Sequence, residues 1–251
     1  MYEPRVRKDK QRVPILSSKD INIIAERYAE EFSPGITTDP RPFDIDLFSE
    51  KYLGLTIDYQ YLSNNGLYFG MTVFNDTDKI IIYDSENNCA DYIHASAGTI
   101  IIDRSLLQRS QEHLYRFTLA HECGHWIFHR EYYGYNPKQL RIDVFDTPYT
   151  KCREINANYK YNTTKNWDSN KWMEWQADKF AAGLLMPKSS VELVACSNHS
   201  KDLESKDAFS MVSKISETFK VSKQAAYIRL NDLKITQNTN SDSDLKQLSY
   251  L

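Results

Sequence analysis

The chain has 251 residues, of which 41% are hydrophobic and 26% are charged, and its formal net charge is -3. This length supplies a sizeable core for one large or two small domains, and the near-neutral charge excludes a generally basic surface, so that any contact with nucleic acid would be local. No run approaches the roughly 20 apolar residues of a transmembrane helix, and the N-terminus lacks the apolar stretch of a secretion signal. We therefore expect a cytoplasmic protein that does not contact membranes.

The first elements are expected to be an arm and two helices. Residues 1–17 are rich in lysine and arginine, which predicts a flexible basic N-terminal arm. Ser17 or Ser18 can then cap a helix over residues 19–32, where apolar side chains recur at helical spacing. A short second helix is expected over residues 44–53.

Four segments have the composition of β-strands. Residues 55–61, 66–74 and 79–84 are rich in β-branched and aromatic side chains and are separated by asparagine, aspartate and glycine. This pattern predicts an antiparallel meander. Residues 98–103 form a further short run of β-branched side chains.

The next predicted helix, over residues 111–131, carries an HExxH motif. A step of four residues turns a helix by about 400°, so His121 and His125 point from one face toward a common point, which suits a zinc ion. Glu122 follows the first histidine and lies beside that point, where a carboxylate can take a proton from water. The motif therefore indicates a hydrolytic metal centre.

Two other residues of this helix, Gly124 and His129, are expected to have structural roles. Gly124 lies within the helix at a cost of about 1 kcal/mol relative to alanine, which indicates a close approach of another part of the chain. His129 lies about 12 Å along the axis from His121 and cannot reach a metal shared by His121 and His125. We expect it to pack or to donate or accept a hydrogen bond beside the site.

Residues 132–170 are aromatic and polar with weak periodicity, and a hairpin around residues 141–145 is the one element suggested there. The segment 172–186 then reads as a helix that ends before a proline. Glu174 and Asp178 share a face of small and apolar residues, where two carboxylates require cationic partners. Glu174 is therefore a candidate third metal ligand, and Asp178 can accept the outer N–H of a ligand histidine.

The last predicted elements are two helices within residues 207–235, with Ser222 as the N-cap of the second. Their pattern resembles a helix-turn-helix unit. Residues 206–234 hold six basic and three acidic side chains, a small excess for phosphate binding. We expect the pair to pack against the rest of the chain or a protein partner, with direct binding of nucleic acid as the less favoured alternative, and we expect residues 236–251 to be a disordered tail.

Taken together, four segments resemble the ImmA/IrrE family of metallo-endopeptidases. They are GTIIID at 98–103, RFTLAHECGHWIFH at 116–129, EWQADKFAAGLLMP at 174–187 and FKVSKQAAYIRL at 219–230. The resemblance extends from about residue 20 to residue 235. The two central segments, in this order, are the specific ones.

The resemblance implies a role for each candidate residue. It assigns His121, His125 and Glu174 as metal ligands and Glu122 as the catalytic acid/base. The position of Asp178 after Glu174 is similar to the gluzincin pattern, in which the aspartate supports a ligand histidine. The family further implies cleavage of a helix-turn-helix transcriptional repressor, which switches on mobile-element or stress-response genes.

Two features depart from the family pattern. Cys123 stands where an apolar residue such as leucine is usual, and the interval of 49 residues from His125 to Glu174 is longer than expected. A small buried side chain is the expected role of Cys123, with a redox-sensitive thiol as the alternative.

The predicted fold class is α+β. We expect a zincin-like catalytic domain over residues 18–190, with a small antiparallel sheet packed on the HExxH helix, followed by a C-terminal helical subdomain over residues 191–235. One of the predicted strands is expected to offer an exposed edge on which a substrate can lie extended.

Two functions are compatible with these observations. The first is a zinc-dependent endopeptidase acting on a transcriptional repressor, with Zn²⁺ as the expected ion and Mn²⁺ or Fe²⁺ as alternatives for the same ligand types. The second is a DNA- or protein-binding regulator that uses the C-terminal helical pair and has a structural or vestigial metal site. The intact Glu122 favours the endopeptidase, because a structural site does not need a base.

Overall fold

The computed structural model describes residues 2–134, 149–153, 167–196 and 207–235, and most of these are helical. The longer helices are α1 (Ser18–Phe32), α3 (Glu112–Gly134), α4 (Ser169–Leu185), α5 (Lys188–Cys196), α6 (Asp207–Phe219) and α7 (Lys223–Asp232). Shorter helical turns are α2 (Ile45–Leu47), η1 (Phe48–Tyr52), η2 (Arg104–Leu107) and η3 (Arg109–Gln111). None of the helices in the described residues has the length and apolar character needed to span a membrane.

The strands form a four-stranded sheet and a separate hairpin. They are β1 (Thr56–Gln60), β2 (Tyr68–Val73), β3 (Thr77–Asp84), β4 (Cys89–Ala95), β5 (Thr99–Asp103) and β6 (Tyr149–Arg153). The sheet has the order β1-β5-β2-β6, and β3 pairs with β4. Strand β1 is parallel to β5, whereas β5 and β6 are antiparallel to β2.

The expectation of an antiparallel meander is wrong, and the sheet is mixed. All five residues of β5 are buried, so this strand takes a central position between β1 and β2, where its β-branched side chains are covered on both faces. The chain leaves the sheet after β2, forms the β3–β4 hairpin, and returns as β5. The strand β4 was not predicted, because its side chains are mostly exposed and carry little apolar periodicity.

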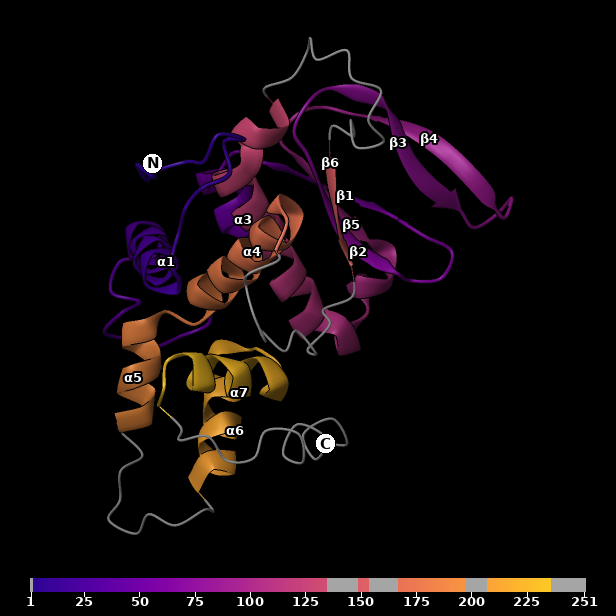
Figure 1. Cartoon of the computed structure of the whole chain (residues 1–251). Helices are drawn as coiled ribbons and strands as arrows, with labels where there is room; N and C mark the ends of the chain where they lie inside the picture. Colours follow the sequence, from indigo (N-terminus) through magenta and orange to yellow (C-terminus); the bar gives the residue numbers. More distant parts are fainter. Residues whose placement is uncertain (1, 135–148, 154–166, 197–206, 236–251) are drawn as a thin grey trace.

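Helix α3 lies between the sheet and the other helices. It contacts β2 and β5 on one side and α4 on the other, and α1 packs on α4 (Figure 1). The β3–β4 hairpin projects away from the helices (Figure 1). The predicted α+β class is therefore confirmed.

The helix boundaries follow from local chemistry. Ser17 accepts a hydrogen bond from the Asp20 amide while Asp20 accepts one from the Ser17 amide, a capping box that begins α1. Ser222 accepts from the Ala225 amide and begins α7, as predicted. The helix expected over residues 44–53 is present as α2 continued by the π-helical turn η1, with Asp44 as its N-cap.

Residues 2–17, the predicted N-terminal arm, lie against the helices in this structure. Val13 and Pro14 are buried, and the carbonyl of Pro14 accepts a hydrogen bond of 2.7 Å from the side-chain amide of Gln176 on α4. Lys8 forms an ion pair with Glu131 at the end of α3. The apolar residues among the basic ones are the physical reason, because their burial holds residues 2–17 on the helices.

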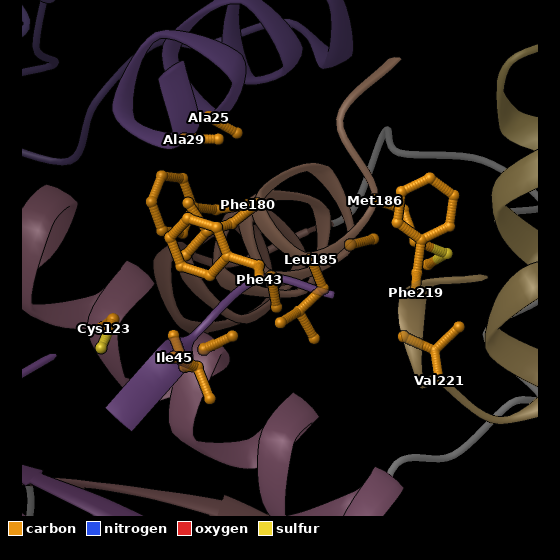
Figure 2. Packing of buried hydrophobic residues seen from close by; sticks show 14 of the residues in the cluster. Ala25, Ala29, Phe43, Ile45, Cys123, Phe180, Leu185, Met186, Phe219 and Val221 are labelled. Atoms are coloured by element: carbon orange, nitrogen blue, oxygen red, sulfur yellow. The ribbon is translucent and has the colours of Figure 1, made fainter. Parts of the chain in front are cut away.

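The C-terminal helical pair shares one hydrophobic core with the other helices. Figure 2 shows Phe219 and Val221, from the end of α6 and the following turn, close to Met186 at the end of α4. The guanidinium of Arg116 on α3 donates to the carbonyl of Phe43 at 2.9 Å and to that of Lys220 at 3.2 Å. The prediction that this pair packs against the rest of the chain is thereby confirmed.

A second buried arginine, Arg229 of α7, connects this helix to the end of α4 and to α1. Arg229 is 1% exposed, and its guanidinium donates to the carbonyl of Met186 and to the side chain of Asn22 on α1. The proposed boundary at residue 190 falls inside α5, and the core continues across it. The predicted hairpin at 141–145 and the predicted tail at 236–251 lie outside the described residues.

Candidate metal centre

Helices α3 and α4 bring three potential metal ligands together. The Nε2 atoms of His121 and His125 are 2.9 Å apart, and each is 3.4 Å from an oxygen of Glu174. The ligand atoms of the three residues all lie within 4.8 Å of one another, so this group could hold a metal ion. Two imidazoles and one carboxylate are a donor set that zinc accepts in hydrolytic sites.

Burial and charge differ among these three side chains. Both histidines are buried, whereas the side chain of Glu174 is 34% exposed. Solvent therefore reaches the three candidate ligands from the side of Glu174. Burial by itself would raise the pKa of Glu174, but the adjacent His125 and His121 lower it overall. Glu174 is therefore an anion beside two imidazoles, as a metal ligand must be.

Gly124 sets the distance between the two helices. A Cβ atom on Gly124 would lie 3.2 Å from the Cα of Ala177 and 3.2 Å from a ring carbon of Phe180. The close approach predicted at this glycine is thus made by the backbone of α4. Ala177 lies between Glu174 and Asp178 in the sequence, so this contact places both carboxylates opposite the histidines.

Glu122 lies beside the three candidate ligands and is closed off from solvent. Its side chain is fully buried, and Oε2 accepts a hydrogen bond of 2.6 Å from the hydroxyl of Thr72 on β2. Burial raises the pKa of Glu122 above its usual value, although His125, His121 and Thr72 act in the opposite direction.

The second oxygen, Oε1 of Glu122, is buried and has no hydrogen-bond partner among the described residues. Buried carboxylate oxygens are rarely left unpaired. An unpaired acceptor next to two imidazoles and a carboxylate fits a site that holds a metal ion and a polar reactant. The donor set and this oxygen together fit a hydrolytic metal centre.

Strand β2 supplies two residues to this environment that the sequence did not indicate. They are Thr72 and Gly70, whose Cβ would lie 2.7 Å from Oε1 of Glu122 if the glycine were replaced by alanine. Gly70 and Thr72 are two residues apart in β2, so they lie on the same face of the strand, and this face is directed at α3. No motif marks them, since they lie about 50 residues before Glu122 in the sequence.

The two candidate ligand histidines have different hydrogen-bonding partners at their Nδ1 atoms. The carboxylate of Asp178 is 2.8 Å from Nδ1 of His121, as expected for this pair. Nδ1 of His125 is 3.0 Å from Nδ1 of His129, so His129 is a hydrogen-bonding neighbour outside the group of ligands, also as expected. Burial lowers the pKa of His129 well below its usual value.

Of the strands predicted from the sequence, β1 lies at an edge of the four-stranded sheet, whereas β2 and β5 lie inside it. Strand β2, which faces Glu122, is paired on both sides, with β5 on one and β6 on the other. In the described part of the chain, the edges of the four-stranded sheet are therefore β1 and β6.

A helix with HExxH against a mixed sheet, with a carboxylate from the following helix as the third candidate ligand, is the arrangement of a metallopeptidase. Residues 83–231, more than half of the chain, match the family model described as the IrrE N-terminal-like domain. The chain belongs to the ImmA/IrrE family of metallopeptidases. A comparison with curated proteins finds no significant match.

Proposed function

We propose that this protein is a zinc-dependent endopeptidase that cleaves a helix-turn-helix transcriptional repressor. The observation that carries the proposal is the position of Glu122, whose unpaired Oε1 lies buried beside His121, His125 and Glu174. A purely structural metal site has no use for a buried carboxylate in this place. The substrate class is inferred from the family alone.

The residues present define the chemistry. His121, His125 and Glu174 would hold the ion, which when bound activates water and polarises the peptide carbonyl. Glu122 takes the proton of the attacking water at Oε1 and transfers it to the leaving amine nitrogen. The hydroxyl of Thr72 donates a hydrogen bond to Oε2 of Glu122, so Oε1 is the oxygen that faces the reactants. Asp178 holds His121 with Nε2 directed at the ligand group.

Metal removal tests the proposed function. We expect the purified protein to contain close to one equivalent of zinc and to cut the repressor encoded beside its own gene at one site. Treatment with a strong chelator should abolish cleavage, and one equivalent of zinc should restore it, because water is not activated without the ion. Parallel additions of Mn²⁺ and Fe²⁺ identify the preferred metal, and an unrelated helix-turn-helix repressor is the control for specificity. Equal cleavage with and without chelator would contradict the proposal, as would failure of the zinc-loaded protein to cut.

Replacement of Thr72 tests how Glu122 is held. Thr72→Val removes the hydroxyl at nearly constant volume and leaves Oε2 unpaired, so kcat should fall about 10-fold with little change in KM. Thr72→Ser should recover most of the loss. Thr118→Val is a matched control, since Thr118 is also buried near Glu122 and its hydroxyl has no partner among the described residues. A similar loss of kcat in both valine variants would show that packing, and not the hydrogen bond, is responsible.

The alternative function is a DNA- or protein-binding regulator that uses the C-terminal pair, and the packing of this pair takes up one of its basic side chains. Arg229, in the last turn of α7, points into the core toward Met186 and Asn22. A basic side chain used in this way is not available for phosphates.

A further inference from the structure

A continuous chain of buried hydrogen bonds connects one ligand histidine to the N-terminal arm. Nδ1 of His125 lies 3.0 Å from Nδ1 of His129, and Nε2 of His129 lies 3.0 Å from Oε1 of Gln176. The side-chain amide of Gln176 in turn donates to the carbonyl oxygen of Pro14 at 2.7 Å. We call these four groups the imidazole–amide chain.

None of its members has access to solvent. His125 and His129 are 0% exposed, Gln176 is 1% exposed, and Pro14 is buried. Water therefore cannot replace a partner or reverse a hydrogen bond within the chain. The direction of each hydrogen bond follows from the groups themselves.

The carbonyl group of Pro14 fixes which group donates in each hydrogen bond of the imidazole–amide chain. A carbonyl oxygen can only accept, so Gln176 must present its NH₂ group to Pro14 and its oxygen to His129. The oxygen of Gln176 can only accept, so Nε2 of His129 carries the proton of that ring. A neutral imidazole has one N–H, which leaves Nδ1 of His129 as an acceptor. Nδ1 of His125 must then be the donor, and its Nε2, which lies 2.9 Å from Nε2 of His121, carries a lone pair and no proton.

We propose that the imidazole–amide chain sets the tautomer of His125, so that the backbone carbonyl of Pro14 acts through Gln176 and His129 to direct the Nε2 lone pair of His125 at the metal. His129 and Gln176 are positioning residues in this scheme. The N–H groups of ligand histidines usually meet a carboxylate, a carbonyl or water. His121 follows that rule directly through Asp178, whereas His125 reaches its carbonyl through two intervening side chains.

The scheme gives the N-terminal arm a place in the metal centre. Pro14 lies more than 100 residues before His125, and its burial against α4 is what brings the terminal acceptor to Gln176. This inference rests on the proposed metal site, but its first test requires no metal.

The first test is the tautomer of His129 in the metal-free protein. Long-range proton–nitrogen spectra of protein labelled with ¹⁵N-histidine distinguish the two neutral forms of each ring. We expect His129 to carry its proton on Nε2, and the Gln176→Met variant to lose this preference because the acceptor is gone. A proton on Nδ1 of His129 in the wild-type protein would overturn the proposal.

The second test is zinc affinity, measured by competition with a chromogenic chelator. His129→Phe and Gln176→Met should each weaken zinc binding by about 10- to 100-fold, the usual effect of removing a group that orients a ligand. Gln176→Glu keeps an acceptor for His129 and should stay within about 3-fold of wild type. His113→Phe, at an exposed histidine of the same helix, is the matched control and should change nothing.

Thermal unfolding of the same variants separates orientation from stability. If His129 and Gln176 only fill space, zinc affinity should follow melting temperature, and Gln176→Glu, with its carboxylate facing the Pro14 carbonyl, should be among the weakest binders. The proposal instead requires that Gln176→Glu retain affinity even where its melting temperature falls. Equal zinc affinity in wild type, His129→Phe and Gln176→Met would overturn it. If the wild-type protein does not bind zinc, the proposed function is refuted. The tautomer of His129 in the metal-free protein then still tests the imidazole–amide chain.

Discussion

Glu122→Gln should lower kcat for repressor cleavage by about 10²- to 10⁴-fold while zinc content stays at the wild-type level. Glutamine has the same shape as glutamate, so the contact with Thr72 and the packing under Gly70 can persist. An amide cannot take up the proton of the attacking water, however, and the reaction loses its base. Single-turnover cleavage of the repressor with equal amounts of zinc-loaded wild type and variant measures the effect.

A matched variant controls for the charge change. Glu112→Gln alters an exposed glutamate in the first turn of the same helix and should leave cleavage unchanged. If Glu122→Gln cleaves at the wild-type rate with a full complement of zinc, Glu122 is not the base. Loss of zinc along with activity would instead show that Glu122 supports the metal.

Gly70→Ala should lower the cleavage activity at least about 100-fold and lower the free energy of unfolding by about 1–3 kcal/mol. The added Cβ would lie 2.7 Å from Oε1 of Glu122, 2.7 Å from Cγ2 of Thr118 and 3.0 Å from Cγ of Glu122. Either β2 moves away from α3 or Glu122 leaves its position. In both cases the carboxylate oxygen beside the metal ligands is displaced.

A double-mutant cycle identifies the cause of that loss. In a Glu122→Ala background, two of the three close contacts are absent, so Gly70→Ala should destabilise the protein by less than it does in wild type. Chemical denaturation of the four proteins gives the comparison. The same cost in both backgrounds would show that the clash with Glu122 is not what makes the glycine necessary.

The local elements of this fold could be predicted from the sequence because their causes are local. The helix start at Ser17, one of two predicted N-caps, the N-cap at Ser222 and the spacing of His121 and His125 depend on residues within one or two helical turns. The structure brings Glu174 to the same histidines, as the carboxylates on a face of small residues had suggested.

The order of the strands could not be predicted in the same way. Pairing of β5 between β1 and β2 depends on which segment is buried on both faces once α3 covers the sheet, and this is a property of the whole fold. The residues that surround Glu122 raise the same difficulty. Thr72 and Gly70 acquire their roles only from the way β2 crosses α3, and the burial of Pro14 depends on α4.

The contact at Gly124 makes the crossing of α3 and α4 a pivot inside the metal centre. Ala177, which touches Gly124, lies three residues after Glu174 and one residue before Asp178, so the two carboxylates are on opposite sides of the pivot along α4. A change in the crossing angle would therefore move Glu174 and Asp178 in opposite directions relative to the histidines. The crossing of the two helices in this structure brings Glu174 to Nε2 of His121 and Asp178 to Nδ1 of His121 at the same time.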